Sequence, residues 1–333
     1  MKKLYNTKKT MPDDMVEGFT NAFPDIVKKG NNRRVVLRTN KKSDQKVTLL
    51  IGNGSGHEPI AMGFIGKGLL DANVVGDVFT APSSDLILEG IKEAYSAAGS
   101  ILLISRHEGD VINGKAACLD AQDEGMDVRP FLMYDDISSA PKGKEEDRRG
   151  AAGTIFIYKI LGAASEQGMA IDDLIRLGER VRSNTRTLGV AINSGISPIT
   201  NEAMFSLPDD EVFIGMGVHG EPGVARKKLG TVKDLVLFMM DKIFEDKKIS
   251  SGETVIVLIN GMGGSTLMEL YSVYNEANNY LGEKKISNVT PMIGAFSTTQ
   301  ETSGFSISLL IPDEQILNLW KANHEAPNFP KIM

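Results

Sequence analysis

The stretch Val47-Thr-Leu-Leu-Ile-Gly-Asn-Gly-Ser-Gly-His-Glu-Pro59 carries the strongest structural signal in this chain of 333 residues. It begins with a short apolar run that ends at a glycine, which is typical of a buried strand. Gly52, Gly54 and Gly56 then alternate with polar residues, and glycine lets a ligand approach the backbone closely. Open α/β sheets bind ligands at the carboxyl ends of their strands. The stretch therefore predicts an α/β fold with a binding loop here, and a tight strand-to-helix turn with an incidental histidine is the simpler alternative.

Strand-like and helix-like patterns alternate along the rest of the chain. Further strands are predicted at residues 34–38, 73–79, 101–104, 128–134, 187–193, 212–216, 254–259, 289–296 and 305–311. Helices are predicted at residues 12–22, 82–98, 110–124, 149–167, 171–186, 232–244 and 265–280. We expect strand 34–38 to pair with strand 47–51, and residues 320–333 to be extended. Alternation of this kind is typical of parallel or mixed sheets covered by helices.

The length of the chain predicts two domains, because single cores rarely grow beyond about 250–300 residues. We expect the boundary near residue 185, where a new series of strands begins. The prediction is therefore two α/β domains, residues 1–185 and 186–333, each a mixed or parallel sheet covered by helices.

The composition excludes several classes of protein. The net charge of −6 gives no overall basic field for nucleic acid. No apolar run approaches the roughly 20 residues that span a bilayer, and the first residues lack the apolar core of a signal peptide. The single cysteine, Cys118, stands in an apolar helical pattern that predicts packing, and it fits a reducing compartment. We therefore expect a cytoplasmic protein with no nucleic-acid or membrane partner.

The four histidines are His57, His107, His219 and His324. No pair has the i, i+4 spacing of a helical metal site, and Cys118 has no second cysteine, so the pattern disfavours a bound metal. His324 is expected to be solvated, whereas His107 fits a ligand contact and a surface position equally well. No segment matches Gly-x4-Gly-Lys-[Ser/Thr], the loop whose amides hold nucleotide phosphates.

Several motifs together resemble the K-type domain of the dihydroxyacetone kinase family (DhaK family), whose signature usually reads GGGSGHEP. Residues 54–59 of this chain read Gly-Ser-Gly-His-Glu-Pro. Further blocks that resemble the family follow in its order at residues 66–71, 76–82, 109–113, 148–154, 215–223, 260–264 and 304–310. Because the ordered match covers nearly the whole chain, the chain is identified as a member of this family, of the stand-alone type that depends on a phosphotransferase system.

The resemblance implies an enzyme that transfers a phosphoryl group to an alcohol group of a short ketose, with a role in glycerol metabolism. His219 resembles the family histidine whose imidazole adds to the ketone and forms a hemiaminal, and neutral imidazole is a nucleophile. Asp110 resembles the family base that takes the proton of the hydroxyl, although this position also suits a helix N-cap. His57 resembles the residue that orients the substrate or shares the proton transfer. Substrate contacts are also implied for Gly54, Ser55 and Gly56.

The chain departs from the family pattern just before Asp110. Residues 105–110 read Ser-Arg-His-Glu-Gly-Asp, where the family commonly has Lys-Asn-Tyr-x-Gly-Asp. Ser105 therefore replaces a lysine often counted among substrate contacts, and Arg106 lies beside it, so both are candidate contacts. Asn53 also stands where glycine is usual. These changes concern the lining of the pocket, so the ketose could be dihydroxyacetone or a tetrulose such as erythrulose.

The resemblance also implies how the phosphoryl group arrives. The K-type chain itself holds no cofactor, whereas ADP or ATP with Mg is bound by an L-type subunit that a phosphocarrier protein rephosphorylates. ATP-dependent relatives carry the L-type domain behind the K-type one, so a chain ending at Met333 is expected to be a free subunit, and a homodimer. A ketose-binding coactivator of transcription and a generic sugar-binding module are the alternatives, and the retained Asp110 favours catalysis.

Overall fold

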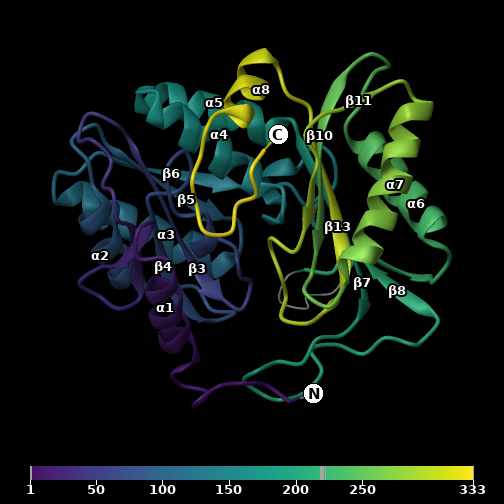
Figure 1. The fold of residues 1–333 in the computed structure, drawn as a ribbon, viewed down its shortest axis with the longest axis horizontal. Helices are drawn as coiled ribbons and strands as arrows, with labels where there is room; N and C mark the ends of the chain where they lie inside the picture. The colour runs from purple at the N-terminus through teal and green to yellow at the C-terminus, as the bar shows by residue number, and fades with distance from the viewer. Residues whose placement is uncertain (1, 218–220, 222, 333) are drawn as a thin grey trace. The chain divides into compact units, whose positions relative to one another are not determined.

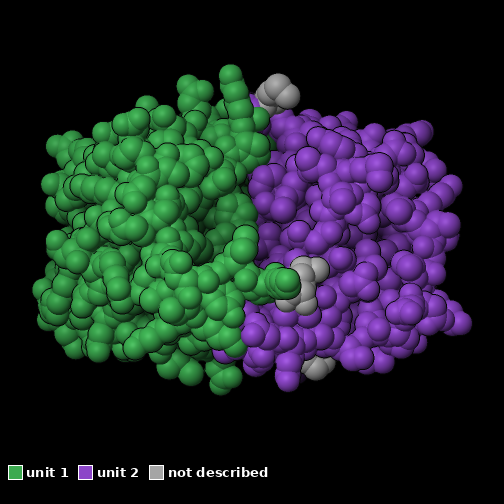
Figure 2. Space-filling model, turned by 60° about the horizontal axis from the view of Figure 1, so that its bottom comes forward, with its two compact units in different colours: residues 1–133, 155–180, 316–331 green, residues 134–154, 181–315, 332–333 purple. Residues whose placement is uncertain are grey.

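The computed structural model describes residues 2–217, 221 and 223–332. It divides into two compact units (Figures 1 and 2): unit 1 consists of residues 1–133, 155–180 and 316–331, and unit 2 of residues 134–154, 181–315 and 332–333. Each unit thus combines segments that are far apart in the sequence, which a single boundary cannot describe. The division into domains 1–185 and 186–333 stays a prediction.

Unit 1 is built on a six-stranded sheet with the order β1-β2-β4-β3-β5-β6. Its strands are β1 (Val27–Lys29), β2 (Val35–Arg38), β3 (Thr48–Ser55), β4 (Ala72–Val78), β5 (Ser100–Ser105) and β6 (Val128–Met133). The last four are parallel, and β1 and β2 form an antiparallel edge. The predicted pairing of strand 34–38 with strand 47–51 is wrong, because β4 lies between β2 and β3 and pairs with both.

Unit 1 also contains all or most of the helices α1 (Met11–Ala22), α2 (Ser84–Ala94), α3 (Glu108–Asp123), α4 (Thr154–Glu166), α5 (Ile171–Ser183) and α8 (Glu314–Lys321). A short 3-10 turn at Met62–Phe64 lies in unit 1, and another at Glu145–Asp147 lies in unit 2. Leu50, Leu102 and Ile104 lie on one face of the sheet and share a core cluster with side chains of α2 and α3. Cys118 is buried in this cluster, as predicted, and burial raises the pKa of its thiol to about 12.

Helix α8 ends at Lys321, so the prediction of an extended segment at residues 320–333 is wrong only for its first two residues, and residues 322–332 form no helix. Ile316, Leu319 and Trp320 bury one face of α8, and the Trp320 ring lies 5.3 Å from that of Phe156 in α4. Figure 1 shows α8 beside α4 and α5. His324 is not a solvated side chain either, because its ring packs 4.9 Å from Phe329. Apolar residues at helical spacing thus form a helix at residues 314–321, which the sequence analysis did not predict.

A buried charged cluster joins three segments of unit 1. The Asp71 carboxylate accepts hydrogen bonds from Lys42 Nζ and the Leu49 amide, each at 2.8 Å, and from Arg38 Nη1 at 3.1 Å. Lys42 Nζ also donates to Ser165 Oγ at 2.9 Å. The Lys42 and Asp71 side chains are only 1% and 4% exposed. The buried Lys42 ammonium therefore depends on Asp71 for its counter-charge, whereas Asp71 is also paired with Arg38.

Asp71→Ala is expected to lower the free energy of unfolding by about 3–5 kcal/mol, because it leaves a buried ammonium without its counter-charge. Urea unfolding followed by circular dichroism measures the change. The matched control is Asp44→Ala, whose carboxylate is 67% exposed and pairs with Lys41 on the surface, where a loss of less than about 1 kcal/mol is expected. Equal losses in the two variants would contradict the assignment of Asp71 as a core counter-charge.

Unit 2 contains a mixed seven-stranded sheet with the order β11-β10-β13-β7-β8-β9 and with β12 also beside β10. Its strands are β7 (Thr185–Asn193), β8 (Glu211–Ile214), β9 (Ala225–Lys228), β10 (Thr254–Gly261), β11 (Ser287–Asn288), β12 (Met292–Gly294) and β13 (Ser303–Leu310). Helices α6 (Val232–Asp246) and α7 (Leu267–Glu283) cover one face of it (Figure 1), and each begins at a threonine capping box. Two sheets covered by helices confirm the predicted fold class.

No helix in the described part of the chain combines the length and the apolar character that a membrane span requires.

Candidate functional site

The glycine-rich loop and the loop before α3 leave the sheet of unit 1 side by side. They lie at the carboxyl ends of β3 and β5, which are parallel neighbours; Ser55 is the last residue of β3, and Ser105 is the last residue of β5. β4, the next strand in the chain after β3, lies on one side of β3, and β5 lies on its other side. The strand order therefore reverses between β3 and β5. Open α/β sheets bind ligands outside the carboxyl ends of their strands at such a switch point. Residues 54–57 and 105–110 therefore occupy the place where this fold binds ligands.

Two glycines of the first loop are required by the backbone. A Cβ atom on Gly54 would lie 2.7 Å from the amide nitrogen of Thr80, which leaves no space for a side chain. Gly56 has a φ of 101°, which L-residues with side chains rarely adopt. The hydroxyl of Ser55, between them, is buried and has no hydrogen-bond partner among the described residues. A buried hydroxyl of this kind is suited to a polar ligand.

Glu58 holds the first loop in shape. Its carboxylate accepts hydrogen bonds from the Gly56 amide at 2.9 and 3.1 Å. Burial raises the pKa of this carboxyl, and the bond from Gly56 opposes the rise. This role of Glu58 cannot be predicted from residue types, because a bond from a carboxylate to its own loop leaves no pattern in the sequence.

The second loop brings the polar side chains of Ser105, His107 and Asp110 close together. His107 Nδ1 lies 3.2 Å from Ser105 Oγ and 3.8 Å from Asp110 Oδ2. His107, rather than Asp110, stands at the N-cap of α3, and Asp110 lies in the first turn of the helix. The prediction that Asp110 caps the helix is therefore wrong, because the helix begins two residues earlier. His107 lies with the candidate residues, 15% exposed, and Arg106 beside it is half-buried.

The segment Phe79–Pro82 connects the two loops. The rings of His57 and Phe79 lie 5.0 Å apart, and Asn113 Nδ2 of α3 donates to the Pro82 carbonyl at 2.8 Å. Phe79 has a φ of 58°, a left-handed conformation that is uncommon for a residue other than glycine. In the sequence this segment is visible only as part of a family block, since the dihedral angle of Phe79 cannot be read from residue types.

His219 lies outside the described residues, so its predicted role stays a prediction. Described residues on either side of it form hydrogen bonds within unit 2. Arg149 Nη2 donates to the Gly215 carbonyl at 3.0 Å and to Asp136 Oδ2 at 2.9 Å, and the Gly217 amide donates to the Glu221 carbonyl at 3.2 Å. Among the residues that the structure describes, no three His, Cys, Asp or Glu side chains form a group that could hold a metal ion.

A polar loop cluster at the switch point of a parallel sheet defines an α/β protein that binds a small polar ligand. The chain belongs to the Dak1 domain family, whose model matches residues 17–328. It is 37% identical to the dihydroxyacetone-binding subunit DhaK of PTS-dependent dihydroxyacetone kinase 1 of Listeria innocua, over 96% of this chain and 98% of that one. The family membership predicted from the motifs is thereby confirmed.

Two further relatives bear on the choice of function. The D-erythrulose kinase of Mycolicibacterium smegmatis is 32% identical over 99% of this chain and 57% of its own length. The solved structure of the dihydroxyacetone kinase operon co-activator Dha-DhaQ is 30% identical and superposes with a TM-score of 0.90, over 97% of this chain and 99% of that one.

Proposed function

We propose that this chain is the ketose-binding subunit of a dihydroxyacetone-type kinase, a phosphotransferase that acts on an alcohol group. The observation that carries the proposal is the placement of residues 54–57 and 105–110 at one switch point of the sheet. The similarity to a dihydroxyacetone-binding subunit over nearly the full length of both chains supports it.

The proposed chemistry begins with capture of the ketose. The imidazole nitrogen of His219 adds to the carbonyl carbon as the C=O π bond breaks. The ring gives up its N–H proton and the former carbonyl oxygen takes up a proton, which gives a neutral hemiaminal. Covalent capture holds a small polar ligand that offers little apolar surface to bury. It also selects carbonyl compounds over polyols such as glycerol, because a polyol has no carbon that the nitrogen can attack.

The remaining residues prepare the terminal hydroxyl for phosphoryl transfer, which depends mainly on positioning and charge placement. Asp110 accepts the proton of the terminal hydroxyl while the oxygen of that hydroxyl attacks phosphorus. His57 orients the substrate. Ser55, through its buried hydroxyl, and the backbone of Gly54 and Gly56 contact the bound ketose. Ser105 and Arg106 also contact the ketose in this proposal. Because Ser105 stands where the family commonly has lysine, these two side chains determine which length of ketose fits.

The phosphoryl donor belongs to a partner in this proposal. An L-type subunit holds ADP or ATP with Mg, and a phosphocarrier protein of the phosphotransferase system rephosphorylates it. The sequence supports this because it lacks the glycine-lysine loop that cradles nucleotide phosphates. We also propose that the chain forms a homodimer and works in the cytoplasm.

The isolated chain is therefore expected to form no phosphorylated ketose from MgATP and dihydroxyacetone or erythrulose. Addition of an L-type subunit with its phosphoryl-donating system should start product formation, which mass spectrometry of the ketose phosphate measures. The L-type subunit without this chain is the control. Product made by this chain alone would overturn the subunit proposal, and the ratio of product from the two ketoses identifies the preferred substrate.

The second candidate function is a ketose-binding coactivator, because the chain also superposes on the operon co-activator Dha-DhaQ with a TM-score of 0.90. A coactivator would form the adduct but give no turnover with any L-type subunit. It would instead copurify with a DNA-binding protein. The retained carboxylate of Asp110 supports the kinase subunit, because ligand capture alone needs no base for the terminal hydroxyl.

A further inference from the structure

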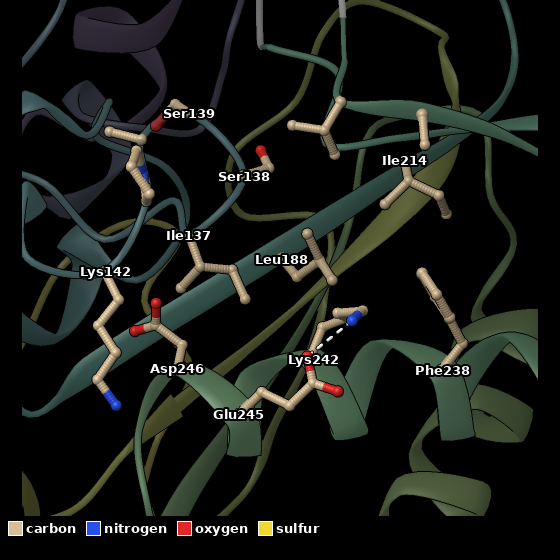
Figure 3. Close-up of a pocket in the computed structure, with 14 residues that line it drawn as sticks. Ile137, Ser138, Ser139, Lys142, Leu188, Ile214, Phe238, Lys242, Glu245 and Asp246 are labelled. Atoms are coloured by element: carbon tan, nitrogen blue, oxygen red, sulfur yellow. Dashed lines mark hydrogen bonds and ion pairs between the residues drawn. The ribbon is translucent and has the colours of Figure 1, made fainter.

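Unit 2 contains a cavity of about 620 Å³ that the proposed function does not use. Figure 3 shows the apolar side chains of Ile137, Leu188, Ile214 and Phe238 around its middle. Val224 also lines it and is 62% exposed, although it is apolar. Binding sites for small molecules are commonly about 300–1,000 Å³ and mostly apolar, with a few polar groups that fix orientation. The cavity therefore has the size and lining of a ligand site.

Charged side chains are gathered along one side of this cavity (Figure 3). Lys242 pairs with Glu245 at 2.7 Å, which neutralises both. Burial raises the pKa of Asp246, but hydrogen bonds from Arg148 and Arg186 outweigh it and lower the pKa below its ordinary value. Two guanidinium groups thus face one carboxylate. Lys142 adds a further positive charge and has no ion-pair partner in the described part of the chain. Because the other charged side chains of the lining are paired, Lys142 supplies the one unpaired charge among the described lining residues, and this charge is positive.

The wall of the cavity includes both flanks of the segment that carries His219. Ile214 precedes this segment, Val224 and Ala225 follow it, and all three line the cavity. The Val224 amide donates to the Ile214 carbonyl at 3.0 Å, which ties the two flanks together. Ser138, also in the wall, donates through its hydroxyl to the Gly215 carbonyl at 3.3 Å. An occupant of the cavity would therefore contact the anchors of residues 215–223.

We propose that this cavity is a regulatory site for a small amphipathic anion. The apolar body of the ligand packs among Ile137, Ile214 and Phe238, and its carboxylate or sulfonate lies beside Lys142. Occupancy restrains the flanks of residues 215–223 and changes the rate at which the ketose is captured. The regulatory part rests on the proposed covalent role of His219, whereas the binding part does not.

The binding part is tested by fluorescence titration with 8-anilinonaphthalene-1-sulfonate and displacement by decanoate. We expect saturable binding at one site per chain, displacement by decanoate, and much weaker displacement by uncharged decanol. Ala225→Trp, at an exposed strand position that lines the cavity, should weaken binding at least tenfold. Lys142→Glu should weaken it roughly threefold to tenfold, the range expected for removing an exposed ion pair and adding repulsion.

The matched control is Lys144→Glu, which makes the same charge change two residues away at a position outside the lining. It should bind the probe as the wild type does. Thermal unfolding of each variant shows that it is folded, since all three substituted residues are exposed. Binding that does not saturate, or that Ala225→Trp and Lys142→Glu leave unchanged, overturns the site.

The regulatory part is tested by the rate of ketose adduct formation, followed by mass spectrometry of the intact protein. Saturating decanoate should change this rate at least twofold in the wild type and should have no effect in Ala225→Trp. An unchanged rate in the wild type with decanoate bound overturns the regulation. If no adduct forms under any condition, the proposed function fails, and the titration still decides whether the cavity binds an amphipathic anion.

Discussion

His219→Ala is expected to abolish covalent capture of a short ketose. The wild-type chain mixed with dihydroxyacetone or erythrulose should gain the mass of one ligand, directly or after reductive trapping, and the variant should gain none. The reason is chemical, because alanine has no nitrogen that can add to the carbonyl carbon. Turnover with an L-type subunit should fall with the adduct, since a small polar ligand is otherwise held weakly.

Two controls separate the covalent role of His219 from nonspecific modification. Glycerol, which has no carbonyl group, should leave the mass of the wild type unchanged. His324→Gln removes another histidine, one that packs against Phe329 in the carboxyl-terminal segment, and should keep the adduct. An adduct of equal yield in His219→Ala would show that another nucleophile captures the ketose.

Asp110→Asn is expected to lower turnover by about 10²–10⁴-fold, the usual contribution of a general base, while the adduct still forms. Asparagine keeps the size of the side chain but cannot accept a proton as a carboxylate does. Because His107 occupies the N-cap of α3, the substitution does not remove a helix cap. A fall in turnover therefore reports on proton transfer rather than on the end of the helix.

Glu108→Gln is the matched control for Asp110→Asn. It neutralises an exposed carboxylate in the same first turn of α3, so turnover should stay at the wild-type value. Unchanged turnover in Asp110→Asn would exclude Asp110 as the base. Loss of the adduct as well as of turnover would instead show that Asp110 shapes the pocket, and His57 would be the next candidate for the base.

Five of the six strands of unit 1 could be predicted from the sequence, all except β1 (Val27–Lys29), but the pairing of the strands could not. The apolar runs around Leu50 and Leu102 are short and end at turn residues, so they indicate strands without any knowledge of the fold. The order of strands is set by tertiary packing. β2 comes directly before β3 in the sequence, yet β4 lies between them in the sheet.

The candidate site shows the same division. Gly54 and Gly56 are visible as residue types, and the structure gives the physical need for each: a close approach to Thr80 and a positive φ. Phe79 adopts a positive φ that its residue type does not suggest, and Glu58 binds back to its own loop. Such features arise from surrounding contacts, so sequence patterns cannot predict them.

The return of residues 316–331 to unit 1 has a consequence for how the protein is made. A ribosome delivers residues 1–133 first, yet Trp320 and Phe329, which pack against the aromatic rings of α4 and of the Met62–Phe64 turn, emerge only after residues 181–315. The nascent chain therefore carries uncovered aromatic surface through most of its translation, a state prone to aggregation. Closure of unit 1 is a late event in biogenesis, and a premature stop codon before α8 would leave this surface permanently open to chaperones and proteases.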